Sequence, residues 1–262
     1  MRIDSVRPFS IVSLGNPDIV VVPCYNEAKR FNPDMLAQAV EETSTHFLFA
    51  NDGSTDKGAT LNLLDDLKRK HPGRVDFISL EKNQGKAEAV RQGLLAALQR
   101  QPKHAGFFDA DGAVPFVQSR QMSDIFVQAK DASAVIAVRS NLAGHDIDRT
   151  AMKYLSQAII SNMANVLFSP KVQDTQCGAK MFDSVQLRQA IVEPFSVNWI
   201  FDIELLTRLS RLEDNKRNKR WLYEYPIPVW KEVGNSTRKP SSYAEALKDY
   251  FKLVKKYGIR RL

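Results

Sequence analysis

The sequence predicts an α/β protein built on a mainly parallel sheet with helices on both faces. Short apolar runs alternate along the chain with stretches whose apolar residues recur at helical spacing, and helical crossovers of this kind connect parallel strands. Clusters of polar residues follow the apolar runs, at the strand ends where open α/β sheets bind ligands. The 262 residues, 44% hydrophobic and 26% charged, are close to the upper size of one hydrophobic core, so a single domain with an elaborated C-terminal part is expected.

The expected strands are short apolar runs rich in β-branched or aromatic residues, most of which end at residues that favour turns. The first is the IVVV run that ends at Pro23, and the fourth ends at the sequence Asp109-Ala110-Asp111-Gly112. The last contains aromatic residues at alternate positions, which is the side-chain period of a strand. The six strands cover residues 19–22, 46–50, 75–80, 105–108, 134–138 and 221–225.

The expected helices are longer stretches with apolar residues on one face, as with Leu61, Leu64 and Leu67. They cover residues 57–70, 86–101, 116–130, 148–168, 202–212 and 243–257. The last of them has an apolar face and four lysines elsewhere, so it is a basic amphipathic helix. Its expected apolar face consists of Leu247, Tyr250, Phe251, Val254 and Tyr257.

The net charge of +7 is concentrated in the C-terminal part of the chain. From Arg211 onward there are 14 basic and 6 acidic residues, whereas the rest of the chain has 23 basic and 24 acidic residues. A localised positive field suits an anionic lipid surface, a nucleotide sugar or a nucleic acid, although a well-solvated basic surface would have the same composition. Three parts are expected: an N-terminal extension (1–18), a main domain (19–240) and the basic amphipathic helix (241–262).

Cysteine content and hydropathy indicate a cytoplasmic protein. Cys24 and Cys177 are too few for a disulfide framework, and with four scattered histidines they lack the spacing of a zinc site. We expect no secretory signal and no transmembrane helix, since the longest uncharged stretch, residues 154–170, is short and interrupted by polar residues. That stretch is expected to pack against the core or to contact a membrane surface, so a peripheral position on the cytoplasmic membrane face stays open.

Two carboxylates, Asp109 and Asp111, directly follow the fourth expected strand. Carboxylates held close together repel unless a cation joins them, and Mg²⁺ or Mn²⁺ binds oxygen ligands together with substrate phosphates. Acidic turn residues are also common without a metal. The hypothesis of a metal site therefore depends also on the polar residues at the other strand ends. The chain lacks the glycine-rich sequences of dinucleotide and P-loop sites and the nucleophile elbow of α/β-hydrolases.

Six short motifs occur in order along most of the chain. They are Val22-Pro23-x-Tyr25-Asn26-Glu27, Asn51-Asp52-Gly53-Ser54-Thr55-Asp56, Asn83-x-Gly85-Lys86, Asp109-Ala110-Asp111, Asp174-Thr175-Gln176-Cys177-Gly178-x-Lys180-x-Phe182 and Trp199-x-Phe201-Asp202-x-Glu204-Leu205. Together they resemble glycosyltransferase family 2, and within it the dolichyl-phosphate (polyprenyl-phosphate) β-glucosyltransferase and mannosyltransferase group. The resemblance implies a GT-A fold with a Rossmann-like mixed sheet, a nucleoside-diphosphate sugar donor, Mg²⁺ or Mn²⁺, and inversion at the anomeric carbon.

The same resemblance implies a role for each matched position. Asp111 would be the main metal ligand, assisted by Asp109, and Asp202 would occupy the place of the acid-base carboxylate. Arg139 and Arg149 would face the donor or acceptor phosphate, and Arg139 would neutralise charge on the leaving diphosphate. The residues expected to bind the donor are Pro23, Tyr25, Glu27, Asp52, Lys86, Asp109, Ala110, Gln176 and Cys177.

The acceptor stays open at this stage. The resemblance favours UDP-glucose as donor and a polyprenyl or dolichyl phosphate as acceptor, although enzymes of that group commonly carry a membrane anchor and only about 18 residues precede the first expected strand. A lipid phosphate is already anionic at neutral pH, whereas a soluble or polysaccharide hydroxyl would need Asp202 as a general base.

A third, non-enzymatic interpretation is nucleic-acid binding by the basic C-terminal part. Trp221, Tyr223 and Tyr225 lie among basic residues and could stack on bases. Their alternate spacing is more typical of a packed strand, so we expect no nucleic-acid partner.

Overall fold

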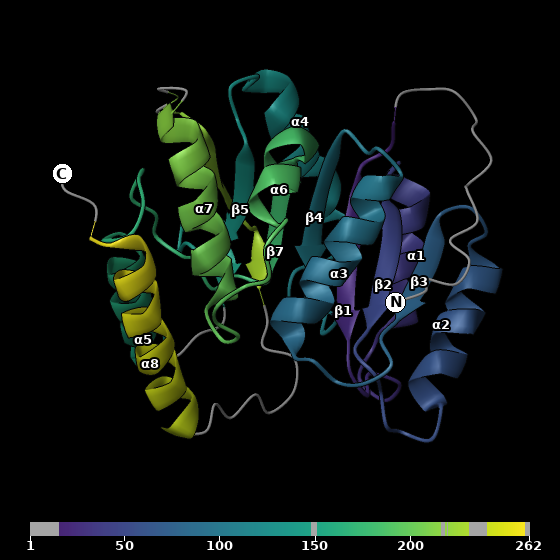
Figure 1. The fold of residues 1–262 in the computed structure, drawn as a ribbon. Coiled ribbons are helices and arrows are strands. Elements are labelled where there is room, and N and C mark those ends of the chain that lie inside the picture. The colour runs from purple at the N-terminus through teal and green to yellow at the C-terminus, as the bar shows by residue number, and fades with distance from the viewer. Residues whose placement is uncertain (1–15, 148–150, 216–217, 219, 231–239, 260–262) are drawn as a thin grey trace.

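A seven-stranded mixed sheet forms the centre of the molecule. The computed structural model describes residues 16–147, 151–215, 218, 220–230 and 240–259. Its strands are β1 (Ile19–Cys24), β2 (His46–Asn51), β3 (Val75–Ser79), β4 (His104–Phe108), β5 (Ala134–Val138), β6 (Asp146–Ile147), β7 (Ala179–Asp183), β8 (Leu222–Pro226) and β9 (Val229–Trp230). The large sheet has the order β3-β2-β1-β4-β7-β5-β8, and β6 pairs with β9 in a separate small sheet (Figure 1). Every pairing in the large sheet is parallel except those of β7, which runs antiparallel to β4 and β5.

Helices cover both faces of this sheet. They are α1 (Pro33–Glu42), α2 (Ala59–Lys70), α3 (Lys86–Gln99), α4 (Gln118–Gln128), α5 (Ala151–Ala164), α6 (Ser184–Ala190), α7 (Phe201–Asn215) and α8 (Pro240–Tyr257). One core cluster contains side chains of α3, α5, α6, α7 and α8, and the other contains side chains of α1, α2 and α4. In Figure 1, α3, α6 and α7 lie on the near face of the sheet.

Strand β1 shows how the sequence produces a buried sheet with a polar edge. Ile19 and Val21 belong to one core cluster and Val20 and Val22 to the other, so the strand is apolar at every position because both of its faces are buried. Its parallel pairing with β2 and β4 places the carboxyl ends of the three strands at one edge of the sheet. The polar motifs that follow these strands therefore lie close together.

The expected α/β class, with a mainly parallel sheet and helices on both faces, is confirmed. All six expected strands and all six expected helices occur, with ends that differ by a few residues. The sequence analysis missed α1 and α6, which are only 10 and 7 residues long. Their starts carry capping side chains, since Asn32 accepts a hydrogen bond from the amide of Asp34, and Asp183 accepts from the amide of Val185.

The most important element that the sequence analysis missed is β7. It contains Lys180, and a lysine in a short apolar run is unusual for a strand that is buried on both faces. The side chain of Lys180 is only 2% exposed, and its ion pair with Asp202 of α7 neutralises the buried charge. A contact between residues so distant in the sequence is not visible in local spacing.

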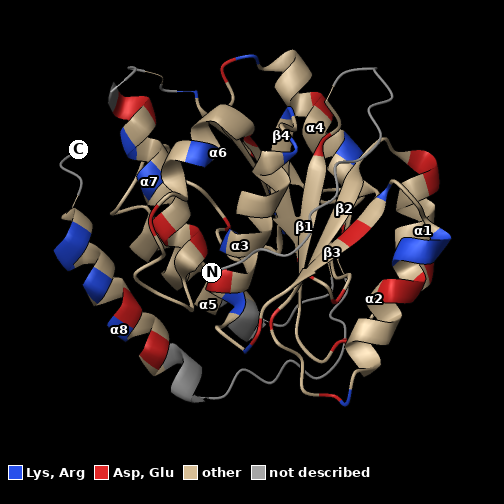
Figure 2. Ribbon diagram, turned by 45° about the vertical axis from the view of Figure 1, so that its right-hand side comes forward, with Lys and Arg blue, Asp and Glu red and all other residues tan. Residues whose placement is uncertain are grey.

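Helix α8 is amphipathic as expected, but its buried face differs from the expected one. Ala246 and Leu253 are buried, and Tyr250, Val254 and Tyr257 pack against the core. Leu247 and Phe251 are instead 49% and 61% exposed. Acidic and basic residues alternate along the first part of the helix in Figure 2, and basic residues alone follow toward its C-terminal end.

Some expectations lie outside the described residues. These include most of the expected N-terminal extension, the first residues of the expected helix at 148–168 with Arg149, and the segment 231–239. The expected domain boundaries at residues 18 and 240 therefore stay predictions. Among the helices that the structure describes, none is both long enough and apolar enough to span a bilayer.

The close approach of β4 and β7 depends on Gly106. A Cβ atom added there would lie 2.1 Å from the carbonyl oxygen of Lys180 and 2.6 Å from Sδ of Met181. We expect Gly106→Ala to lower the free energy of unfolding by at least about 2 kcal/mol, because the backbone of β7 would have to move. Urea denaturation measures this, with Val127→Ala on the exposed face of α4 as a control that should change stability by less than about 0.5 kcal/mol. Equal unfolding midpoints for the two variants would contradict this packing.

Candidate functional site

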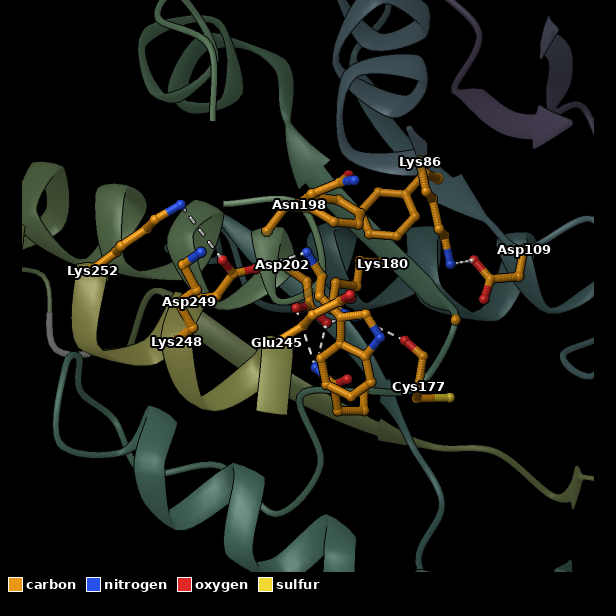
Figure 3. A pocket seen from close by; sticks show the side chains of 15 residues that line it. Lys86, Asp109, Cys177, Lys180, Asn198, Asp202, Glu245, Lys248, Asp249 and Lys252 are labelled. Carbon is orange, nitrogen blue, oxygen red and sulfur yellow. Dashed lines mark hydrogen bonds and ion pairs between the residues drawn. The ribbon is translucent and has the colours of Figure 1, made fainter. Parts of the chain in front are cut away.

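Two cavities adjoin at the carboxyl edge of the sheet. The smaller cavity has a volume of about 380 Å³ and is lined by the segments that follow β1, β2 and β4 together with the start of α3. The larger cavity has a volume of about 590 Å³ and is lined chiefly by the segment before β7, by α7 and by α8 (Figure 3). Lys86 and Asp109 line both, so the two cavities meet at this pair of side chains.

The smaller cavity brings together most of the residues expected to bind the donor and the metal. Tyr25 stands at its edge and is 40% exposed, whereas Glu27 and Asp52 are buried. Their positions follow from the parallel register of the strands that precede them. The expected residues that line this cavity are Pro23, Tyr25, Glu27, Asp52, Lys86, Asp109, Ala110 and Asp111.

Asp52 shapes the wall of the smaller cavity through the backbone. Its two carboxylate oxygens accept hydrogen bonds from the amides of Gln84 and Gly85, at 2.7 and 2.9 Å. The turn after Asp52 requires Gly53, because its φ is 60° and an added Cβ would lie 2.4 Å from the backbone of Lys82. Asp52 thus fixes the loop that leads into α3 and presents Lys86 at the start of that helix.

The carboxylates of the smaller cavity make it strongly negative. Burial raises the pKa of Asp111 above its ordinary value, and the charge of Asp109 raises it further. Burial also raises the pKa of Glu27, although the nearby Arg30 opposes this effect. Oε2 of Glu27 is buried and has no hydrogen-bond partner among the residues that the structure describes. Such a group of carboxylates is stabilised by a cation.

In this structure the cation beside Asp109 is Lys86, whose Nζ lies 2.6 Å from Oδ1 of Asp109. Asp109 and Asp111 also suit a divalent metal, because Mg²⁺ usually binds one or two carboxylates and completes its shell with phosphate oxygens and water. Among the described residues no three His, Cys, Asp or Glu side chains converge on one metal position. The donor set therefore fits a metal that is held jointly with a diphosphate.

Asp202 lies in the first turn of α7 and lines the larger cavity. Its Oδ2 lies 3.0 Å from Nε2 of Gln176 and 3.3 Å from Nζ of Lys180, and its Oδ1 accepts the amide of Ile203. Lys180 also donates to the carbonyl of Cys177, at 2.8 Å, and lies over the ring of Phe107. These donors fix the orientation of the Asp202 carboxylate toward the cavity (Figure 3).

Gln176 and Cys177 line the larger cavity, beside Asp109 and Asp202. Burial raises the pKa of the Cys177 thiol to about 12, so the thiol is protonated at neutral pH and acts as a small, largely apolar wall. The next residue, Gly178, has no room for a side chain, since an added Cβ would lie 2.6 Å from Cγ of Asp109. The close approach of this segment to Asp109 places the two cavities side by side.

Arg139 takes a position different from the expected one. Its guanidinium donates to Asp174 from Nε at 2.6 Å and from Nη2 at 2.9 Å, and it lies 5.4 Å from the ring centroid of Trp230. Burial alone would raise the pKa of Asp174, but Arg139 holds it below its ordinary value. Arg139 lines neither cavity and anchors the segment before β7. Its role as a phosphate ligand, like that of Arg149, stays a prediction.

The sequence analysis assigned no role to several residues that line the larger cavity. Lys180 and Trp199 belong to quoted motifs, so a signal was present, but their partners are distant in the sequence. Asn198 accepts the amide of Ala87 at the start of α3, at 3.3 Å. Helix α8 contributes four more residues to this cavity. The sequence pattern predicted the helix, but it did not show against which elements the helix packs. The four residues are Glu245, Lys248, Asp249 and Lys252.

Comparison with known proteins assigns the family. Residues 19–184 match the model of the family described as "Glycosyl transferase family 2", which is more than half of the chain. The chain belongs to this family. It is therefore a glycosyltransferase, as the sequence motifs predict.

Among curated proteins, the chain is similar to several that are named dolichyl-phosphate beta-glucosyltransferase. The protein from Dictyostelium discoideum is 26% identical over 259 residues, which cover 91% of this chain and 74% of that protein. The protein from Drosophila melanogaster is 30% identical over 213 residues, covering 74% of this chain and 63% of that protein. The one from Saccharomyces cerevisiae is 28% identical, covering 83% and 67%.

Solved structures show the fold. A mannosyltransferase from Pyrobaculum calidifontis, PcManGT, solved in complex with GDP-Man and Mn²⁺, has a TM-score of 0.62 at 15% identity and covers 98% of this chain and 70% of that chain. Residues 1–349 of TarS from S. aureus have a TM-score of 0.55 at 15% identity, with coverage of 93% and 67%. The expected GT-A fold is confirmed.

The ion pair between Lys180 and Asp202 can be tested by a double-mutant cycle. Both residues are buried, so Lys180→Met leaves a buried carboxylate without its cation, and we expect a loss of about 3–5 kcal/mol in the free energy of unfolding. Adding Asp202→Asn should recover much of that loss, because the unpaired charge is gone. Urea denaturation of the two single variants and the double variant measures the coupling. Equal costs of Lys180→Met with and without Asp202→Asn would contradict the pairing.

Proposed function

We propose that this glycosyltransferase moves glucose from UDP-glucose to a polyprenyl or dolichyl phosphate, with inversion at the anomeric carbon and with Mg²⁺ or Mn²⁺. One observation carries the proposal: the smaller cavity, with Asp109 and Asp111, adjoins the larger cavity, with Asp202, and Lys86 and Asp109 line both. The names of the relatives from three organisms support a dolichyl phosphate acceptor. PcManGT, solved with GDP-Man and Mn²⁺, supports a nucleotide sugar and a divalent metal.

The donor is proposed to lie across both cavities. The nucleoside would lie in the smaller cavity against Tyr25, and the diphosphate would lie near Lys86 at the N-terminus of α3, a position that favours phosphate. Asp111 and Asp109 would hold the metal, which when bound neutralises charge on the diphosphate. The sugar would then reach the larger cavity beside Gln176 and Cys177.

The reaction would be a single in-line displacement. An acceptor phosphate oxygen attacks C1 of the glucose, and the bond between C1 and the diphosphate oxygen breaks, with its electron pair leaving on UDP. Lys86 stabilises the charge that develops on the leaving diphosphate, since a preorganised cation in the cavity needs little reorganisation.

The role of Asp202 depends on the acceptor. A phosphate acceptor is already an anion and gives up no proton, so a carboxylate held by Lys180 and Gln176 would orient the sugar or the acceptor. A hydroxyl acceptor would instead transfer its proton to Asp202. The relatives favour the first role, and the second remains the outcome to be distinguished by experiment.

A lipid acceptor requires that the enzyme meet a membrane surface. Helix α8 exposes Leu247 and Phe251, and the exposed Lys248 and Lys252 directly follow them in the sequence. An exposed apolar pair flanked by cations suits shallow contact with anionic lipid, to which each cation contributes about 1 kcal/mol. We propose this face of α8 for peripheral contact with the cytoplasmic side of a membrane.

Transfer assays with purified protein test the proposed function. Radiolabelled UDP-glucose is incubated with Mg²⁺ or Mn²⁺ and either a short-chain prenyl phosphate or the prenyl alcohol of the same length. We expect transfer to the phosphate and not to the alcohol, and loss of transfer with a chelator. Transfer to the alcohol alone would support the hydroxyl acceptor, and turnover of other nucleotide sugars in preference to UDP-glucose would contradict the proposed donor.

The metal assignment predicts the effect of Asp111→Asn. Because this substitution removes a charged metal ligand, we expect kcat to fall by at least about 10²-fold. Asp66→Asn, on the exposed surface of α2, is the matched control and should leave kcat unchanged. Unchanged metal-dependent turnover of the Asp111 variant would contradict the assignment.

A further inference from the structure

Helix α8 supplies one wall of the larger cavity. Glu245 and Asp249 are four residues apart, as are Lys248 and Lys252, so the four share one side of the helix, and all four line the cavity together with Asp202 (Figure 3). The residues of this wall lie outside the part of the chain that matches the family model. The function of this face of α8 is therefore not given by the family motifs.

Glu204 fixes α8 in this position. Its carboxylate is 0% exposed, and Oε1 accepts from the hydroxyl of Tyr257 at 2.8 Å and from Nζ of Lys256 at 3.0 Å, both in the last turn of α8. Arg208 of α7 donates to the same oxygen, at 2.8 Å. The other oxygen accepts the amide and the hydroxyl of Ser196, at 2.7 and 2.9 Å. A fully buried carboxylate needs all of these donors, so α7, α8 and the segment before α7 are held together.

A second interaction connects α8 to the rest of the cavity wall. Asp249 is 9% exposed, and its Oδ2 accepts the amide of Trp199 at 3.1 Å. Its Oδ1 lies 3.9 Å from Nζ of Lys252. The carboxylate of Asp249 is therefore already bound to the backbone of the cavity wall. The lysines beside it, Lys248 and Lys252, are exposed.

The lysines of the larger cavity differ in their pairing. Lys86 pairs with Asp109 and Lys180 pairs with Asp202, so both are neutralised by carboxylates at short distance. Within the described part of the chain, the one ion pair of Lys252 is the 3.9 Å contact, and its side chain is 52% exposed. Lys248 is exposed and forms no ion pair with any residue that the structure describes. Among the described lysines of the larger cavity, Lys248 and Lys252 are thus the two that no carboxylate holds at short distance.

We propose that Lys248 and Lys252 bind the phosphate of the acceptor, and that Glu204 is the positioning residue that holds them at the cavity. This inference rests on the proposed function and specifies its acceptor site. The chemical class of the ligand is a phosphate monoester of an isoprenoid chain. Two ammonium groups one helical turn apart can both reach one phosphate, and Leu247 and Phe251 next to them offer exposed apolar surface to the chain of the lipid.

The test compares the variant Lys248→Met/Lys252→Met with Lys255→Met. Lys255 is an exposed lysine of the same helix that does not line the cavity, so it controls for the loss of surface charge. Geranyl phosphate serves as a soluble acceptor that needs no membrane. We expect the double variant to raise KM for geranyl phosphate at least about tenfold and to leave KM for UDP-glucose unchanged. The reason is that the two substitutions remove charged hydrogen bonds to the acceptor phosphate and none to the donor.

Calorimetric binding of geranyl phosphate in the presence of UDP and Mn²⁺ gives a readout that is independent of turnover. The double variant should bind at least about tenfold more weakly, and the Lys255 variant should bind like the unchanged protein. If the unchanged protein binds geranyl phosphate and the double variant binds it equally well, this site is wrong and the proposed function stands. If the unchanged protein neither binds nor uses geranyl phosphate but still binds UDP-glucose, the proposed acceptor and this site both fail.

The positioning role of Glu204 has its own readout. Glu204→Gln keeps the shape of the side chain but removes the charge that pairs with Arg208 and Lys256. We expect faster hydrogen exchange in residues 244–257, unchanged exchange in β1, β2 and β4, and a raised KM for geranyl phosphate with an unchanged KM for UDP-glucose. Faster exchange without a change in the acceptor KM would show that Glu204 has only a structural role.

Discussion

The direction of strand β7 determines how the cavities are built. Because β7 runs antiparallel between two strands of a parallel sheet, its first residue lies at the edge where its neighbours end. The segment that enters β7 therefore delivers Gln176, Cys177 and Gly178 to the site, directly against Asp109. Lys180 of the same strand forms the ion pair with Asp202. The antiparallel direction of β7 therefore brings residues of the larger cavity next to Asp109, which lines both cavities. This arrangement requires Gly106 and Gly178, where a side chain would collide with a neighbouring strand or with Asp109.

Each cavity carries carboxylates that this chain stabilises with its own lysines. Lys86 lies against Asp109 and Lys180 lies against Asp202, so neither aspartate is buried without a cation. The two pairs differ in what can replace the lysine. Lys86 is half exposed and stands at a cavity that would admit a metal and a diphosphate, whereas Lys180 is enclosed and also bound to the carbonyl of Cys177. Under the proposed function a bound metal and diphosphate would compete for the first pair, whereas the enclosed second pair belongs to the framework of the cavity.

The sequence predicted the features that depend on local pattern. The apolar run of β1 and the motifs at the ends of β1, β2 and β4 were sufficient to predict the parallel sheet and the residues of the smaller cavity. Features that depend on partners distant in the sequence were not predictable in this way. The ion pair of Arg139 with Asp174 was not predicted, and the expected role of Arg139 at a phosphate stays a prediction. Strand β7 was missed because its lysine is neutralised by a residue of α7. In α8 the apolar pattern was correct, but it could not tell that Leu247 and Phe251 would face outward.

The two cavities come from different parts of the chain. The smaller is lined only by residues up to Asp111, and the larger mostly by residues from Gln176 onward. If the nucleotide and the acceptor bind as proposed, substitutions from Gln176 onward would alter which acceptor receives the sugar and leave recognition of the nucleotide largely unchanged.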